Sequence, residues 1–326
     1  MVKRWAAWLA VVAGVLALPP SSRAADVRTP IVSGLPWRSG ASVDDPYIDF
    51  GRWRRRPIDV DVVFIGHRTW NEMRERITAG TIVRQGRSRA PLLAVSLALL
   101  PHEARKRHRA CANGDFDHHF RAFGAGFVRQ GAGDAIVRLG WEANIGSDSH
   151  PWGVDSMADV PAYKGCFRSA ARALKSTAPG LKIEWSVAKR GTVPVLLTYP
   201  GDDVVDVWGF HYYDSGPRKT TQEIWDRYVA AGEPNDPWGI AAFLIEARKH
   251  GKKVSVPEWG VWQRADMPGD PDNPRYIENM YRFFRANAAH IAYENYYNRP
   301  AVHQLFPSER FPKARATYQD LWSQGQ

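Results

Sequence analysis

Eight apolar runs of strand length recur along the chain, and segments able to form helices separate them. The runs cover residues 35–39, 60–65, 92–97, 135–144, 181–187, 204–210, 253–257 and 291–296. The clearest helical segments cover residues 116–130, 161–176, 276–287 and 313–322, and Thr69 is placed to cap a further helix that begins at Trp70. In residues 116–130, phenylalanines recur at spacings of four, three and four, which indicates a helix face packed on a core.

This alternation favours an α/β fold consisting of a single (β/α)8 TIM barrel. Eight strand and helix repeats in about 300 residues suit that fold, which usually needs about 250 residues or more. An open doubly wound sheet is the alternative, but no glycine-rich nucleotide-binding loop follows the first run. We therefore expect one domain over residues 26–326.

Three of the apolar runs end in residues suited to chemistry. Glu142 ends the fourth run, Tyr213 follows the sixth and Glu258 follows the seventh. The carboxyl ends of all barrel strands open on one face, so these side chains would meet there despite their separation in sequence. The alternative for Glu142 and Glu258 is a pair of strand-end carboxylates in structural ion pairs.

Two glutamates that converge among aromatic side chains are typical of a site that cleaves sugars. Cleavage of an acetal needs a proton on the leaving oxygen and a carboxylate opposite the developing positive charge. Aromatic faces provide a surface on which pyranose rings stack. The candidate aromatic residues are Trp141, Trp152, Tyr213, Trp259 and Trp262. Trp262 is either a platform for an outer sugar or ordinary loop packing.

The segments around these positions resemble a known family. They are Arg138-Leu-Gly-Trp-Glu-Ala-Asn144, Tyr199-Pro-Gly-Asp-Asp203 leading into Val207-Trp-Gly209, Tyr213-Asp214 and Pro257-Glu-Trp-Gly260. In order and spacing they resemble glycoside hydrolase family 26, the group best known for β-mannanases, over residues 36–322. The resemblance implies a (β/α)8 barrel and retaining cleavage by double displacement.

The resemblance also implies roles for individual residues. Glu142 would be the acid/base and Glu258 the nucleophile. Tyr213 would hydrogen-bond the nucleophile, Arg138 would steady the carboxylates, and Trp152 would line the subsite beside the scissile bond. The full set of residues that we expect to contact substrate is Arg138, Trp141, Asn144, Trp152, His211, Tyr213, Trp259, Trp262 and Tyr296.

Two positions depart from the family pattern. Many members place His before the acid/base, where this chain has Trp141, and Trp at the end of the eighth strand, where it has Tyr296 or Tyr297. The expected substrate is therefore either a β-mannan-like polysaccharide or a bacterial exopolysaccharide. His211 is either a core histidine or a substrate contact. We expect burial beside Trp141 to raise the pKa of Glu142, which would suit a proton donor.

Residues 1–25 have the layout of a secretory signal peptide. A short basic segment precedes an apolar run from Trp5 to Leu18, and small residues suited to cleavage follow at Ala24 and Ala25. A retained N-terminal anchor is the alternative, although the run is shorter than the roughly 20 residues of a membrane span. We expect a secreted or periplasmic protein whose mature chain has no membrane span.

The chain is basic, with a formal net charge of +10. Residues 1–25 contain three basic residues and no acid, so their removal leaves +7. Such a surface favours an acidic polymer or an anionic cell envelope. Basic clusters at residues 52–56 and 105–109 would also suit nucleic acid, but the chain has no nucleic-acid-binding motif and we expect no such partner.

The chain has two cysteines, Cys111 and Cys166. In an oxidising compartment they can form a disulfide, and two independent buried thiols are the alternative. Neither has a Cys or His neighbour at metal-site spacing, so we expect no metal and no cofactor.

Together these features predict a monomeric, secreted, retaining endo-β-glycosidase that acts on a polysaccharide. A transglycosylase that remodels an exopolysaccharide is the first alternative. A polysaccharide-binding barrel without activity is the second, although a binder needs neither glutamate.

Overall fold

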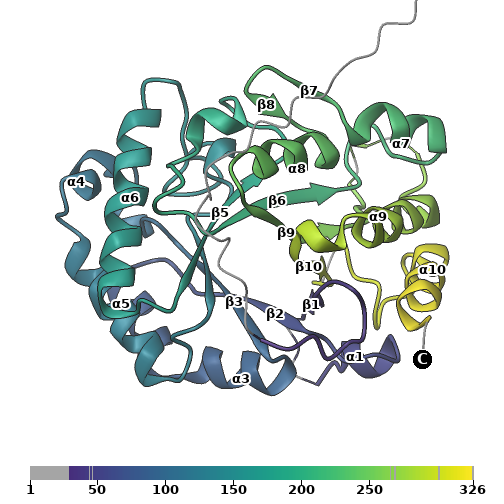
Figure 1. Ribbon diagram of the computed structural model, residues 1–326, viewed down its shortest axis with the longest axis horizontal. Helices are drawn as coiled ribbons and strands as arrows, with labels where there is room; N and C mark the ends of the chain where they lie inside the picture. The colour runs from purple at the N-terminus through teal and green to yellow at the C-terminus, as the bar shows by residue number, and fades with distance from the viewer. Residues whose placement is uncertain are drawn as a thin grey trace, which may run out of the picture.

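The computed structural model describes residues 29–43, 45, 47–264, 266–267, 269–299 and 302–324. The predicted signal peptide lies outside the described residues. Within them, eight parallel strands close into a barrel, which confirms the predicted (β/α)8 fold (Figure 1). Around the barrel the strands follow the order β1, β10, β9, β6, β5, β4, β3, β2. They are β1 (Ser39–Ser42), β2 (Val60–Phe64), β3 (Leu92–Leu97), β4 (Ile136–Leu139), β5 (Lys182–Ala188), β6 (Val207–Tyr213), β9 (Lys253–Gly260) and β10 (Ile291–Tyr297).

Helices surround the barrel and cover the outer face of its strands (Figure 1). They are α1 (Phe50–Trp53), α2 (Trp70–Thr78), α3 (Thr81–Arg89), α4 (His108–Ala112), α5 (Asp117–Arg129), α6 (Val160–Thr177), α7 (Gln222–Val229), α8 (Ile240–Lys249), α9 (Pro274–Ala286) and α10 (Pro312–Ser323). Short 3₁₀ turns are η1 (His102–Ala104), η2 (Ala143–Ile145), η3 (Val195–Thr198) and η4 (Ala288–His290). Strands β7 (Gly232–Glu233) and β8 (Asp236–Pro237) form a separate antiparallel pair. In the described part of the chain, no helix combines the length and the apolar character needed to cross a membrane.

The predicted helices are found within one or two residues of their expected bounds, and Thr69 caps α2 as predicted. The first strand differs from the prediction. It was expected over residues 35–39, but β1 begins at Ser39. Leu35 and Trp37 are buried, but they pack as an irregular segment ahead of the strand. The strand consists of small residues, and at Gly40 only glycine fits, because a Cβ there would lie 2.0 Å from the carbonyl oxygen of Val60.

The barrel interior has an apolar layer and a polar layer. Alternate strand residues point inward, and the apolar layer consists of Val60, Val62, Leu92, Ala94, Ile136, Val207, Ala292 and Tyr293. Two residues along β4 from Ile136, Arg138 also points inward and contacts Ser96 of β3 and Glu184 of β5. The polar layer therefore lies toward the carboxyl ends of the strands, the usual location of a barrel active site.

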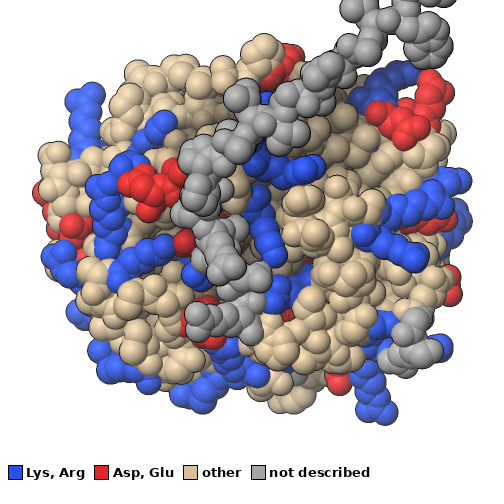
Figure 2. Space-filling model, in the orientation of Figure 1, with Lys and Arg blue, Asp and Glu red and all other residues tan. Residues whose placement is uncertain are grey.

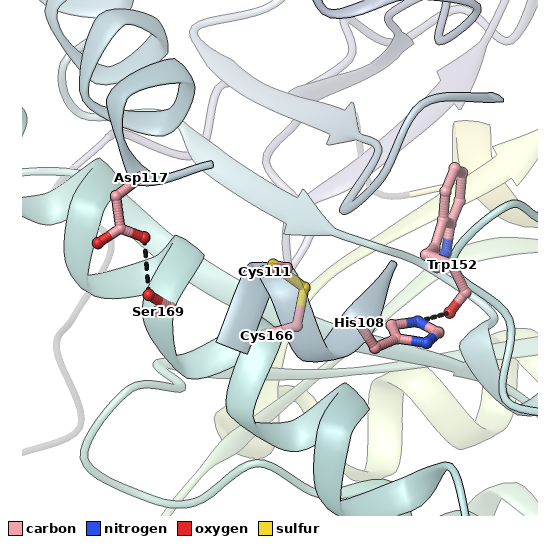
Figure 3. The surroundings of a disulfide bond; sticks show 6 residues. All are labelled: His108, Cys111, Asp117, Trp152, Cys166 and Ser169. Atoms are coloured by element: carbon pink, nitrogen blue, oxygen red, sulfur yellow. Dashed lines mark hydrogen bonds between the residues drawn. A yellow bond between two sulfur atoms is a disulfide. The ribbon is translucent and has the colours of Figure 1, made fainter. Parts of the chain in front are cut away.

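A disulfide between Cys111 and Cys166 joins α4 to α6 (Figure 3). On α4, the imidazole of His108 donates to the carbonyl oxygen of Trp152 at 3.0 Å. Trp152 lies in the loop after β4, and its indole N–H donates to the carbonyl oxygen of Trp141 at 2.8 Å. The disulfide therefore anchors the helix that supports the loop carrying Glu142.

Candidate active site

Glu142 lies in a tight turn directly after β4. Its backbone is left-handed, with φ of 52°, a conformation that costs energy for a residue other than glycine. The turn is held to β5 on both sides. The N–H of Glu142 donates to Ser186 O at 2.8 Å, and the amide of Asn144 exchanges two hydrogen bonds with the backbone of Ala188. These bonds turn the carboxylate of Glu142 toward the barrel axis.

Glu258 lies near the end of β9, and both of its carboxylate oxygens accept hydrogen bonds. Nη2 of Arg138 donates to Oε1 at 2.7 Å, and the hydroxyl of Tyr213 donates to Oε2 at 2.9 Å. Burial and the nearby charge of Glu258 raise the pKa of Tyr213 well above its ordinary value, so the phenol keeps its proton and donates. The Glu258 side chain is 8% exposed.

His211 connects the two glutamates. Its Nδ1 lies 2.7 Å from Oε1 of Glu142, and its Nε2 lies 3.7 Å from Oε1 of Glu258. Nε2 also lies 2.6 Å from Nη2 of Arg138, which can only donate. In the neutral ring Nε2 is therefore the acceptor and Nδ1 carries the proton, and Nδ1 donates to Glu142 in the neutral and in the charged ring. A single imidazole thus spans the gap between the two carboxylates.

Arg138 is fully buried beneath the two glutamates and is held on several sides. Its Nη1 donates to Ser96 at 2.7 Å and its Nε to Glu184 at 3.3 Å, while Tyr293 donates to the other oxygen of Glu184 at 2.6 Å. Burial lowers the pKa of Arg138, but the charge of Glu258 and further acidic neighbours outweigh burial and raise the pKa above its ordinary value. The guanidinium therefore stays charged.

The pKa of Glu142 is lower than its ordinary value, and the prediction that burial raises it is wrong for the free protein. Burial does raise the pKa of this carboxyl group. The charge of His211 and hydrogen bonds from His150 and His211 lower it by more. Nε2 of His150 lies 3.4 Å from Oε2 of Glu142, the oxygen that His211 leaves open.

Neither family models nor curated protein sequences match this chain. Solved structures do match it. GH26C from a Muricauda species has 14% sequence identity and a TM-score of 0.61, with 90% of this chain and 87% of that chain covered. The barrel fold of this chain is therefore shared with that family 26 structure.

Two further structures share this fold. An endo-β-1,4-mannanase double mutant from Cellulomonas fimi has 17% identity and a TM-score of 0.61, with 88% of this chain and 71% of that chain covered. The catalytic domain of a GH26 endo-β-1,4-mannanase from a Bacillus species has 14% identity and a TM-score of 0.60, with 89% of this chain and 88% of that chain covered. At these identities the likeness establishes the fold.

Several aromatic side chains lie around the glutamates. The ring of Tyr213 lies 5.3 Å from Trp262 and 5.9 Å from Tyr297, measured between ring centroids. Phe64 lies edge-on to both Tyr297 and Trp141, at 6.2 and 5.6 Å. Of these residues, Tyr213, Trp262, Tyr297 and Phe64 are partly exposed, whereas Trp141 is 6% exposed.

Five residues expected to contact substrate have fully buried side chains; they are Arg138, Asn144, Trp152, Trp259 and Tyr296. Asn144 and Trp152 bond the backbone of the β4 turn, as described above. Trp259 and Tyr296 point outward from the barrel. The indole of Trp259 donates to Glu294 at 2.6 Å and stacks near Trp322 of α10, and the Tyr296 ring lies edge-on to Trp259. These two side chains contact the helix layer, and their role as sugar contacts stays a prediction.

Three residues belong to the site without having been predicted as part of it: His150, Glu184 and Tyr297. Glu184 carried a signal, because it is a lone acid in the apolar run 181–187, in register with Arg138 of β4. Tyr297 was named only as the alternative to Tyr296, and its inward direction follows from the strand alternation that turns Tyr296 outward. His150 lies in an irregular loop, and no local pattern connects it with Glu142.

Proposed function

We propose that this protein is a retaining glycoside hydrolase of the family 26 type. The observation that carries the proposal is the pair Glu142 and Glu258, which the carboxyl ends of β4 and β9 bring so close that His211 spans them. Glu142 acts as the acid/base and Glu258 as the nucleophile. The shared fold with mannanase structures supports the reaction class.

Glu258 is arranged for attack on an anomeric carbon. Both of its oxygens accept hydrogen bonds from groups that keep their protons, Arg138 and Tyr213. These bonds suit a carboxylate that must be ionised before it attacks and must leave again when water hydrolyses the glycosyl-enzyme.

Glu142 must gain a proton before the first step, and substrate binding provides the cause. A sugar that enters beside Oε2 separates Glu142 from His150 and excludes water. Loss of the His150 hydrogen bond and exclusion of water both raise the pKa of Glu142 in the complex. His211 keeps its hydrogen bond to Oε1, which orients Oε2 toward the leaving oxygen.

The substrate we propose is a polysaccharide, either β-mannan-like or an exopolysaccharide with acidic groups. The endo-β-1,4-mannanases that share the fold support the first. The basic composition supports the second, and Figure 2 shows Lys and Arg side chains spread over one face of the molecule with fewer acidic ones among them.

We also propose that the protein is exported. The basic and apolar segments of residues 1–25 support this, as does the disulfide between Cys111 and Cys166, since disulfides persist in oxidising compartments.

Release of reducing ends from mannans, xylans, mixed-linkage glucans and bacterial exopolysaccharides tests the proposed function. We expect cleavage of one class, and a loss of about 10³-fold or more in the Glu258→Gln variant with its circular dichroism unchanged. Glu233→Gln, in the exposed β7 and β8 hairpin, is the matched control and should keep full activity. Binding without cleavage on every glycan, or a fully active Glu258→Gln variant, would refute the proposal.

A further inference from the structure

A small cavity lies outside the barrel, between the end of β5 and the loop from β6 to α7. Its volume is about 10 Å³. The residues that line it are Lys189, Arg190, Tyr212, Gly216, Pro217, Lys219, Tyr228 and Trp238. Within the described residues, this lining contains three cationic side chains and no acidic one. The cavity is separate from the cleft, because Tyr212 points away from the barrel axis while its neighbour Tyr213 points toward Glu258.

Two lysine amines converge on this cavity. Nζ of Lys189 and Nζ of Lys219 both donate to the carbonyl oxygen of Ser215, at 2.7 and 3.0 Å. Both also lie over the ring of Tyr212, at 5.7 and 5.3 Å from its centroid. Lys219 is only 2% exposed, so water outside the protein solvates its charge poorly.

The positive charge here exceeds the negative charge that faces it. Asp214 is the acidic neighbour of both amines, and its Oδ1 lies 3.7 Å from Nζ of Lys219. Oδ1 also accepts the backbone N–H of Lys219, and Oδ2 accepts from Asn273. Burial and then the charge of Lys219 lower the pKa of Lys189. Each ammonium has three N–H donors. In the described residues their partners are one shared carbonyl, one distant carboxylate and the Tyr212 ring, and the two amines also hydrogen-bond each other.

We propose that the cavity between Lys189 and Lys219 binds one small anion, with chloride as the physiological occupant. A single negative charge would compensate the second ammonium, and the remaining N–H groups would donate to it. The size of the cavity selects the occupant, since a volume of about 10 to 15 Å³ on this measure holds one water-sized particle. A phosphate, sulfate or sugar carboxylate is too large.

The anion would stabilise the loop that follows Tyr213. Next to that tyrosine, the N–H of Asp214 donates to Gly260 O at 3.0 Å, and Lys219 approaches the Asp214 carboxylate. Anion binding keeps both lysines charged and holds residues 214–219 against the end of β9, where Glu258 lies. The proposal does not depend on the reaction at Glu258.

Chloride NMR tests the site directly in the full-length protein. We expect the wild type to broaden the chloride line, with the excess width saturating as chloride rises and disappearing when bromide competes. In Lys189→Met most of this saturable broadening should be lost. Lys249→Met, an exposed lysine on α8, is the matched control and should keep it. The absence of saturable broadening in the wild type would overturn the proposal, as would equal broadening in Lys189→Met.

Thermal unfolding gives an independent readout that needs no catalytic assay. Sulfate raises midpoints in general through its exclusion from protein surfaces, so the readout is the difference between proteins. When sulfate is replaced by chloride up to about 300 mM at constant ionic strength, the change in the midpoint should be more favourable by about 2 to 4 °C in the wild type than in Lys189→Met, and Lys249→Met should follow the wild type. Equal changes in the wild type and Lys189→Met would contradict the proposal.

Discussion

Glu142 is held at both carboxylate oxygens by histidines of different kinds. His211 is 2% exposed and fixed by Arg138 and Ser186, so it orients Glu142 permanently. His150 lies in a loop, is partly exposed, and stacks on Trp152 at 4.8 Å. Both contacts lower the pKa of Glu142, but only the more exposed His150 is placed to be displaced when a substrate enters.

Replacing His150 by Ala should shift the pH dependence of catalysis. His150 lowers the pKa of Glu142 in the free protein, so its removal raises that pKa. Glu142 then keeps its proton to higher pH, and the basic limb of the profile of kcat/KM moves toward higher pH. His290→Ala, in the 3₁₀ turn at the opposite end of β10, is the control and should leave the profile unchanged. A basic limb that stays in place or moves to lower pH in His150→Ala would show that His150 does not act on Glu142.

At the scale of residues, the sequence could locate Glu142, Glu258 and Tyr213, because each follows an apolar run and barrel topology gathers strand ends. The direction of the aromatic residues also follows from strand alternation, which the prediction for Trp259 and Tyr296 did not take into account. Trp259 follows Glu258 directly, and strand alternation sends it to the helix layer. The pKa of Glu142 was out of reach, because His150 and His211 reach it from other segments of the chain.

The covalent link between α4 and α6 acts at the scale of elements. α4 has only five residues, too few to be stable without tertiary contacts. Cys111 ties it to the long helix α6, and His108 of the same short helix supports Trp152. The sequence left this pairing open, since it reveals two cysteines and not their distance.

Replacing Cys111 and Cys166 by Ser should lower the thermal midpoint. The disulfide closes a loop with a sequence separation of 55, which stabilises by roughly 4 kcal/mol in the chain-entropy model. The expected decrease is about 5 to 15 °C, measured by calorimetry. Wild-type protein treated with a reductant should match the double variant. Equal midpoints for the oxidised wild type and the double variant would exclude a stabilising disulfide.

At the scale of the whole molecule, a buried acid makes stability depend on pH. Asp61 of β2 is 1% exposed, and burial raises its pKa from 3.8 to about 7 despite Arg89, whose Nε lies 3.1 Å from Oδ2. Between about pH 4 and pH 7 the unfolded chain releases this proton while the folded chain retains it. The contribution of Asp61 to stability is therefore full below pH 4 and decreases as pH rises to 7.

Replacing Asp61 by Asn should remove this contribution. Urea unfolding between about pH 4 and pH 7 should show a smaller loss of stability with rising pH in Asp61→Asn than in the wild type, by up to a few kcal/mol over the range. Asp148→Asn, at a fully exposed position, should follow the wild type. Parallel curves for Asp61→Asn and the wild type would show that Asp61 is ionised in the folded protein.

The central claim is that Glu258 attacks the sugar while Glu142 transfers the proton. In a Glu142→Ala variant, hydrolysis of the glycosyl-enzyme should slow. With an activated aryl glycoside of the sugar that the wild type cleaves as the substrate, the glycosyl-enzyme should therefore accumulate. Acid quenching followed by peptide mass spectrometry should find one glycosyl group on Glu258. Phenol release by Glu142→Ala with no adduct on Glu258 would contradict the account.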